Sequence, residues 1–243
     1  MTQMRLPFCL ISNDKEVNYQ HIFEFCRQSQ MTNPYQNVCE HTDKTIADYA
    51  LEIDDEARLR ESFSLGCDAS RIDKRGNTIL MRAYANDAVK CVLYLLTLRV
   101  TREQLGLRNK YGQTCLHIFV QHAADPSRYN AINYKNVLYM EDHNGITPFV
   151  LALGIGRFDM ARHFVKKGYN VNMLNTRGKA PIHVIVGDYK LDTATANKAV
   201  IWLIKHGADP TLTDTSSRDA VEYAKQRNQL LIVKTLKSVL SGR

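Results

Sequence analysis

The chain has 243 residues, of which 44% are hydrophobic, and it carries a formal net charge of +7. No apolar run approaches the roughly 18–20 residues that a membrane-spanning helix needs. The apolar stretch within residues 4–11 is also shorter than the about 7–15 residues at the core of a secretory signal. We therefore expect a soluble chain and exclude the integral membrane proteins.

The first 41 residues contain one recognisable helical pattern. Tyr19, Ile22, Phe23 and Cys26 fall at positions i, i+3, i+4 and i+7, which is the spacing of one apolar face of a helix. We predict an N-terminal helical cap over residues 1–41 that covers the apolar face of the element after it.

From residue 42 the chain repeats itself. Equivalent slots lie 33, 36, 33, 33 and 39 residues apart, and they hold Thr45, Thr78, Thr114, Thr147, Ala180 and Asp219. A period of roughly 20–50 residues is typical of a solenoid, whose units bury their apolar faces only against each other. We predict repeats at 42–74, 75–110, 111–143, 144–176 and 177–215, with a C-terminal cap at 216–243.

Each repeat has the same local pattern. A glycine precedes the anchor slot in four of them, as in Gly145 and Gly178, and a recurrent glycine indicates a backbone position with φ > 0. The anchor threonines are expected to cap a first helix, and Pro148 and Pro181 fit its first position. Apolar residues at helical spacing then predict a longer second helix in each repeat.

Three segments depart from this pattern. Residues 124–141 lack the aliphatic second-helix spacing, and Asp125-Pro126 predicts a late, short helix there. The insertion at 100–108 contains Thr101-Arg102-Glu103-Gln104, which we interpret as an extra capped turn. The insertion at 189–195 is expected to make a longer loop between the two helices of the fifth repeat.

The phrases at 112–118, 145–172 and 178–214 resemble those of the ankyrin repeat family, which uses Gly-x-Thr-Pro-Leu-His-x-Ala and a later Gly-Ala-Asp-x-Asn. The resemblance covers about residues 42–243. It implies an all-α solenoid of stacked helix-turn-helix units with β-turn fingers, about five full repeats plus capping units. It also implies that His117 and His183 occupy a slot whose ring hydrogen-bonds between neighbouring turns.

Nothing in the sequence supports an active site or a metal site. Cys115 and His117 are two residues apart, so on a helix they point to different faces. The histidines and the six scattered cysteines form no pattern with metal-ligand spacing, and we interpret the cysteines as reduced, part-buried residues. We expect no enzyme activity, no cofactor and no metal.

The resemblance implies recognition by the finger tips and the inner face of the first helices. Most fingers carry a positive charge, and aligned fingers would place these charges in one stripe that attracts acidic partners. The expected contact residues are Lys44, Lys74, Arg75, Asn77, Lys110, Tyr111, Gln113, Gln121, His122, His143, Ile146, Ile155, Arg177, Lys179 and Arg218.

The function we predict is that of a monomeric protein-interaction module or adaptor that binds an acidic segment of a partner protein along its concave finger face. The alternative is binding of nucleic acid or phosphoinositide through the same basic stripe, and solvated, lysine-rich turn tips would explain the charges without any function. We expect a reducing compartment, the cytoplasm or nucleus. The architecture is also similar to ankyrin effectors that bacteria deliver into host cells, and equally to eukaryotic or viral adaptors.

Overall fold

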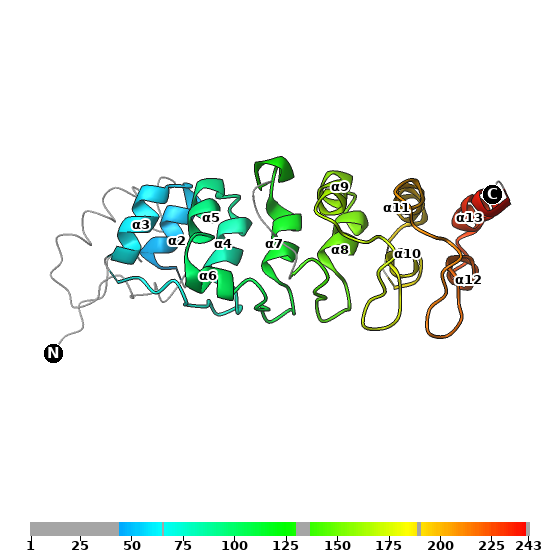
Figure 1. The fold of residues 1–243 in the computed structure, drawn as a ribbon, viewed down its shortest axis with the longest axis horizontal. Helices are drawn as coiled ribbons and strands as arrows, with labels where there is room; N and C mark the ends of the chain where they lie inside the picture. The colour runs from blue at the N-terminus through cyan, green and yellow to red at the C-terminus, as the bar shows by residue number, and fades with distance from the viewer. Residues whose placement is uncertain (1–43, 65, 130–136, 189–190, 242–243) are drawn as a thin grey trace. The chain divides into compact units, whose positions relative to one another are not determined.

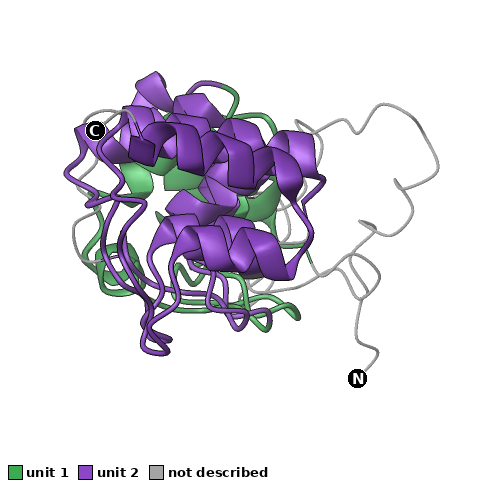
Figure 2. Ribbon diagram, turned by 90° about the vertical axis from the view of Figure 1, so that its right-hand side faces the viewer, with its two compact units in different colours: residues 1–110, 122–124 green, residues 111–121, 125–243 purple. Residues whose placement is uncertain are grey.

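The computed structural model describes residues 44–64, 66–129, 137–188 and 191–241, and the regular secondary structure in these ranges is helical, with no strand (Figure 1). The predicted cap helix at Tyr19–Cys26 and the rest of residues 1–43 lie outside the described residues. Chain contacts divide the protein into two compact units, residues 1–110 with 122–124 and residues 111–121 with 125–243 (Figure 2).

The first unit is built from two helix pairs and one extra turn. Its helices are α2 (Ile46–Glu52), α3 (Glu56–Ser64), α4 (Ile79–Ala85), α5 (Val89–Leu95) and α6 (Arg99–Glu103). Helix α2 packs on α3 and α4 packs on α5, while α2 also contacts α4 and α3 contacts α5. Fully buried residues such as Leu51, Leu59 and Leu95 fill the space between the pairs, as expected for layers that bury apolar faces against each other.

The second unit continues the same construction. Its elements are α7 (Cys115–His122, whose last residue belongs to the first unit), the 3-10 helix η2 (Pro126–Tyr129), α8 (Pro148–Gly154), α9 (Phe158–Lys166), α10 (Pro181–His183), the π-helix η3 (Val184–Asp188), α11 (Thr193–Lys205), α12 (Ala220–Gln226) and α13 (Leu230–Ser241). Helix α8 packs on α9 and α12 on α13, and α11 contacts both α8 and α13. Loops project from one side of these layers (Figure 1).

The first helices begin where the anchor slots predict. The hydroxyls of Thr45, Thr78 and Thr147 each accept a hydrogen bond from the backbone N–H three residues later, at 3.3–3.4 Å. Pro148 and Pro181 are the first residues of α8 and α10. These N-caps satisfy backbone donors that a helix start otherwise leaves unpaired, and they confirm the prediction for these three threonines. The Thr114 hydroxyl lies 2.9 Å from Nδ1 of His117.

The repeated glycines have the conformation that their spacing predicts. Gly76, Gly112, Gly145 and Gly178 have φ values of 80°, 77°, 77° and 67°. Gly112 also faces a close neighbour, because a Cβ at this position would lie 2.5 Å from the backbone nitrogen of His143. Positive φ and this close approach both require glycine.

Two of the three irregular segments differ from expectation. The extra turn exists as α6, but Leu98 is its N-cap, and the buried Thr101 lies inside it, donating its hydroxyl to the carbonyls of Leu95 and, at 3.0 Å, Leu98. The predicted loop at 189–195 is shorter, because Asp192 caps α11 by accepting from Thr195 N–H at 2.9 Å. Residues 189–190 lie outside the described chain.

The third irregular segment agrees with its prediction as far as it is described. Pro126–Tyr129 forms a 3-10 helix, and the Asp125 carboxylate accepts from Ser127 N–H at 2.8 Å. Residues 130–136 lie outside the described chain. Across the described residues, none of the helices combines the length and the apolar character that a membrane crossing requires.

Candidate interaction surface

The finger loops share one internal hydrogen-bond pattern. In the finger of the fifth repeat, Asn175 Oδ1 accepts from the backbone N–H groups of Arg177 at 3.0 Å and Lys179 at 2.9 Å. Asp73, Asp142 and Asp214 make the equivalent pair of bonds in their own fingers. Because a side chain at the base of each finger holds its backbone, the residues between these bonds are presented in a fixed conformation.

Neighbouring fingers are also joined to each other within each unit. In the first unit, Lys110 N–H donates to the Arg75 carbonyl at 3.0 Å. In the second unit, Thr176 donates its N–H and hydroxyl to the buried Glu141 carboxylate at 2.7 and 2.6 Å, and Asn175 Nδ2 reaches the Gly145 carbonyl at 3.4 Å. These bonds align successive fingers and make each row a rigid surface.

The two slot histidines have the structural role that the resemblance implies. His117 is fully buried, and its Nδ1 accepts from Thr114 N–H at 3.1 Å while its Nε2 lies 2.9 Å from the Ile146 carbonyl of the next finger. His183 likewise accepts from Ala180 N–H at 3.0 Å and contacts the Leu212 carbonyl at 2.8 Å. In each histidine, Nδ1 is used at the start of its own helix and Nε2 joins that helix to a neighbouring loop. Burial lowers the pKa of His183.

The described cysteines, Cys67, Cys91 and Cys115, are buried and form no disulfide. The thiols of Cys91 and Cys115 are poor nucleophiles. Burial raises the pKa of Cys115 to about 12, and burial together with Asp54 raises that of Cys91 to about 12. Reactive cysteines instead have lowered pKa values and exposed sulfurs. Within the described part of the chain, no three histidine, cysteine or carboxylate side chains gather as metal ligands.

The first unit exposes part of the predicted contact set. Lys74, Arg75 and Lys110 are exposed on finger loops, and His122 is exposed at the end of α7. The other two predicted residues are engaged in the fold. Asn77 is half-buried, donates to Asp73 at 2.9 Å and accepts from Asn109 at 3.0 Å. Lys44 forms an ion pair with Glu52.

In the second unit the predicted residues divide into exposed and engaged groups. Tyr111 is 60% exposed and Ile155 45%. Gln121, His143 and Arg177 are also exposed, whereas Gln113 is half-buried. Arg177 lies across the preceding finger, because a Cβ at Gly145 would be 3.2 Å from the Arg177 guanidinium carbon.

Lys179 and Arg218 are half-buried around one aromatic ring rather than projecting as free tips. The Lys179 ammonium lies 5.1 Å and the Arg218 guanidinium 4.7 Å from the centroid of the Tyr223 ring. Arg218 also pairs with the buried Asp214 carboxylate at 2.9 Å. Burial alone would raise the pKa of Asp214, but hydrogen bonds from Tyr223 and Arg218 hold it below its usual range.

Ile146 requires a correction. It was predicted to contact a partner, but its side chain is only 8% exposed, and its carbonyl bonds to His117 and to Asp142 N–H at 2.9 Å each. An apolar side chain in a finger gains more by packing beneath the loop than by facing water. Ile146 is therefore part of the core.

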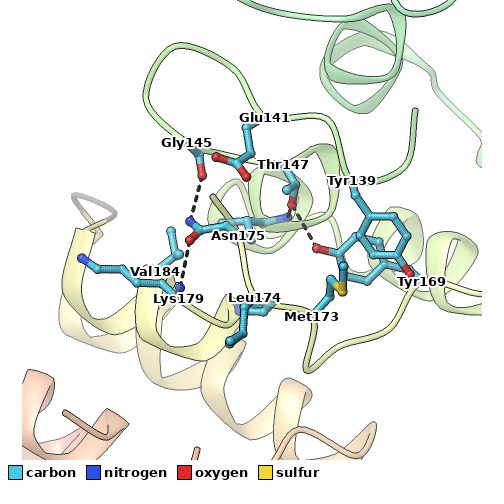
Figure 3. Close-up of a pocket in the computed structure, with 12 residues that line it drawn as sticks. Tyr139, Glu141, Gly145, Thr147, Tyr169, Met173, Leu174, Asn175, Lys179 and Val184 are labelled. Atoms are coloured by element: carbon cyan, nitrogen blue, oxygen red, sulfur yellow. Dashed lines mark hydrogen bonds between the residues drawn. The ribbon is translucent and has the colours of Figure 1, made fainter. Parts of the chain in front are cut away.

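Met173 and Leu174 are exposed apolar residues that the prediction missed. They are 47% and 46% exposed, and with Tyr139, Glu141 and Lys179 they line a hollow beside the finger of the fifth repeat (Figure 3). The cavity volume is about 20 Å³, close to the space of one water and far below a small-molecule site. In the sequence, Met173 and Leu174 are two consecutive apolar residues, and the equivalent positions of the next repeat hold Leu212 and Thr213. This pair was the signal that could have indicated an apolar surface.

The hollow lies beside a paired departure from the repeat pattern. Val150 occupies the slot that His117 and His183 fill in other repeats, and Tyr169 stands where the next repeat has Ala208. The Tyr169 ring stacks on Phe149 with centroids 4.2 Å apart, and its hydroxyl lies 3.2 Å from that of Thr147 (Figure 3). Tyr169 thus supplies the partner for this threonine that an imidazole supplies for Thr114.

No family model matches the chain. A stretch of 150 residues is 23% identical to the nuclear factor NF-kappa-B p105 subunit of Gallus gallus, and the match covers 58% of this chain. It covers only 15% of that protein's length, so the comparison concerns a small part of the relative.

Two solved structures match most of the chain. The ankyrin repeat domain of Bcl-3, a member of the IkappaB protein family, has a TM-score of 0.71 and 18% identity, with 96% of this chain and 100% of that chain covered. EF0377, an ankyrin repeat protein, has a TM-score of 0.55 and 19% identity, with 79% and 96% covered. At these identities the matches establish the fold alone.

Proposed function

We propose that this chain, which has the ankyrin-repeat fold, is a protein-interaction module that binds an acidic segment of a partner protein on its finger loops. The observation that carries this proposal is the direction of the finger charges. Asp73, Asp142 and Asp214 turn inward and accept backbone N–H groups, whereas Lys74, Arg75, Lys110 and Arg177 are exposed. The loops therefore present an excess of positive charge to solvent, which attracts acidic partners.

Exposed apolar residues supply the second component of a binding surface. Tyr111, Met173 and Leu174 are about half-exposed or more, and the last two adjoin the finger that carries Arg177. Interface energy concentrates in aromatic and apolar anchors surrounded by polar contacts. We infer that the partner segment places an apolar side chain against Met173 and Leu174 and its carboxylates near the finger cations.

The test is charge reversal on a partner captured from a eukaryotic lysate. After identification, the partner is titrated against the chain and against the quadruple variant Lys74→Glu, Arg75→Glu, Lys110→Glu and Arg177→Glu. We expect the affinity to fall at least about fourfold, since four surface charge pairs contribute about 0.2–1 kcal/mol each, or about 0.8–4 kcal/mol together. Unchanged affinity at physiological salt would falsify the proposal.

A matched control separates site from net charge. The variant Arg162→Glu, Lys166→Glu, Lys205→Glu and Lys234→Glu changes the same number of exposed charges on the helices of the second unit, away from the finger loops. Partner affinity is expected to survive in this control. An equal loss in both variants would indicate attraction by net charge without a specific surface.

Nucleic acid or phosphoinositide remains the alternative ligand of the finger cations, on the strength of the net charge of +7. Binding of single strands usually stacks bases on several aromatic rings. Among the described residues, Tyr111 is the one phenylalanine, tyrosine or tryptophan whose side chain is largely exposed. A steep decrease of affinity for generic DNA with rising salt would favour this alternative.

We also propose that the chain works as a monomer in a reducing compartment, the cytoplasm or nucleus. The support for the compartment is that Cys67, Cys91 and Cys115 are buried and form no disulfide, since a chain in an oxidising compartment tends to use its cysteines in disulfides. Light scattering on purified protein tests the first point, and microscopy of the tagged chain tests the second.

A further inference from the structure

The second helices of the second unit, α9, α11 and α13, lie on the side away from the loops (Figure 1). Positions i, i+3 and i+7 of a helix share a face. In each of α9, α11 and α13, one set of three residues with this spacing is exposed. We call the three sets together the outer face; its residues are Asp159, Arg162, Lys166, Lys198, Ile201, Lys205, Leu231, Lys234 and Ser238.

The outer face is strongly basic. It has five cations and one carboxylate, and that carboxylate, Asp159, pairs with Arg157 at 2.7 Å. Across the described chain, none of the five cations takes part in an ion pair. Their charges are therefore available to an external anion.

Second helices do not carry this charge in general. The equivalent exposed residues of α3 are Ala57, Arg60 and Ser64. Those of α5 are Lys90, Leu93 and, just after the end of the helix, Thr97. Arg60 pairs with Glu56 at 2.7 Å and lies 3.9 Å from the centroid of the Tyr94 ring. The first unit thus has one unpaired cation over two helices, whereas the second has five over three.

Helix stabilisation explains only two of the five cations. A lysine in the last turn interacts favourably with the helix dipole, which accounts for Lys166 and Lys205, but the effect is confined to the terminal turns. Arg162, Lys198 and Lys234 lie in helix interiors. Their positive charge has no local structural role.

We propose that the outer face binds the anionic headgroups of a lipid bilayer. Ile201 is 36% and Leu231 47% exposed within this face, and Leu230 beside it is 75% exposed. Apolar side chains that lie among cations are stabilised when they enter the boundary of headgroups and acyl chains. The phosphate backbone of a nucleic acid has no apolar surface to contact them. The face has no aromatic residue on which a base could stack.

The hollow beside the finger of the fifth repeat is not lined by outer-face residues. A bilayer needs no pocket, because each cation near an anionic surface contributes about 1 kcal/mol. Binding there would leave the finger loops of this unit accessible to a protein partner.

The experiment is cosedimentation of the full chain with vesicles. We expect binding to vesicles of phosphatidylcholine and phosphatidylserine in equal parts, no binding to phosphatidylcholine alone, and release at high salt. The variant Arg162→Glu, Lys166→Glu, Lys205→Glu and Lys234→Glu should lower the partition coefficient at least about 100-fold. Circular dichroism checks that the variant is folded.

Two further variants make the result decisive. The finger variant with Lys74, Arg75, Lys110 and Arg177 changed to glutamate has the same net charge and should keep vesicle binding. The variant Ile201→Ser and Leu231→Ser should lose vesicle binding several-fold, because it removes the exposed apolar side chains and leaves the charges of the outer face unchanged.

The proposal is overturned by any of three results. These are no sedimentation with anionic vesicles at low salt, an equal loss in the outer-face and finger variants, or vesicle binding that the serine substitutions leave intact. The proposed protein-binding function fails separately, since it depends on the finger variant and on a protein partner.

Discussion

Val150 and Tyr169 show how two residues can replace one recurrent contact of the repeat pattern. A valine in the histidine slot removes the imidazole that bonds to the capping threonine elsewhere, as His117 does to Thr114. Tyr169 fills the vacated space, is 5% exposed, and brings its hydroxyl to Thr147. Burial raises the pKa of this tyrosine, so the hydroxyl stays protonated and able to donate.

This exchange predicts strong coupling between the two positions. Tyr169→Ala should destabilise the protein by about 3 kcal/mol through loss of a buried ring, and Val150→His alone should cost about 1–3 kcal/mol by overpacking. In the double variant, the imidazole can occupy the space of the ring and bond to Thr147. We expect the double variant to be more stable than the sum of the single changes by at least about 1 kcal/mol.

Urea unfolding of the four proteins measures this coupling. Val150→Ala combined with Tyr169→Ala is the control, because alanine cannot restore the bond to Thr147. Additive effects in the histidine pair would show that Tyr169 does not replace the imidazole.

At the scale of elements, the fingers depend on close approach as well as on backbone conformation. Gly112 and Gly168 have φ values of 77° and 92°, but a Cβ at Gly112 would meet His143 N at 2.5 Å, whereas one at Gly168 would meet nothing within 4 Å. The two positions therefore separate conformational strain from contact between fingers.

We expect Gly168→Ala to cost about 1–2 kcal/mol, the strain of an alanine at positive φ. Gly112→Ala should cost roughly 2 kcal/mol more, since the backbone of the next finger must move. Differential scanning calorimetry of both variants gives the comparison. Equal transition temperatures would mean that the fingers are not in contact in solution.

The irregular elements show where sequence pattern fails. Asp125-Pro126 predicts a late, short helix because both residues act locally, and a 3-10 helix begins there. Thr101 was placed as a cap because threonine favours that position, yet it is buried inside α6 and bonds to carbonyls of the preceding turn. Its role depends on packing against α5, which local propensity does not contain.

At the scale of the whole molecule, stability in acid depends on buried histidines. His163 on α9 is 5% exposed and packs against Phe119 with ring centroids 6.0 Å apart. Burial, with Lys167 and Lys166 nearby, lowers its pKa from 6.5 to about 4. The unfolded chain therefore binds a proton at a higher pH than the folded one.

This difference in proton binding determines how the free energy of unfolding changes with pH. The contribution of neutral His163 is fully present above pH 6.5 and is lost as the pH falls from 6.5 towards 4, because protons then favour the unfolded state. We expect about 1–2 kcal/mol of loss over this range. Urea unfolding at both ends of the range should show a smaller pH dependence in His163→Leu than in the parent, and an unchanged slope would contradict the assignment.

We propose two charged surfaces for this chain. The finger loops bind a protein partner, and the outer face binds anionic lipid. The finger and outer-face variants have equal net charge, so their opposite effects on the two ligands would show that position decides, not total charge. Loss of both activities in either variant would argue against this division.

The sequence by itself determined the period, the caps and the turn glycines, because each is a local requirement of backbone geometry repeated along the chain. Only the tertiary structure decided which finger residues face solvent. Ile146 packs inward, and Lys179 and Arg218 surround Tyr223, because residues far apart in the sequence compete for the same space and the same partners. Exposure is a property of that packing, and no local pattern records it.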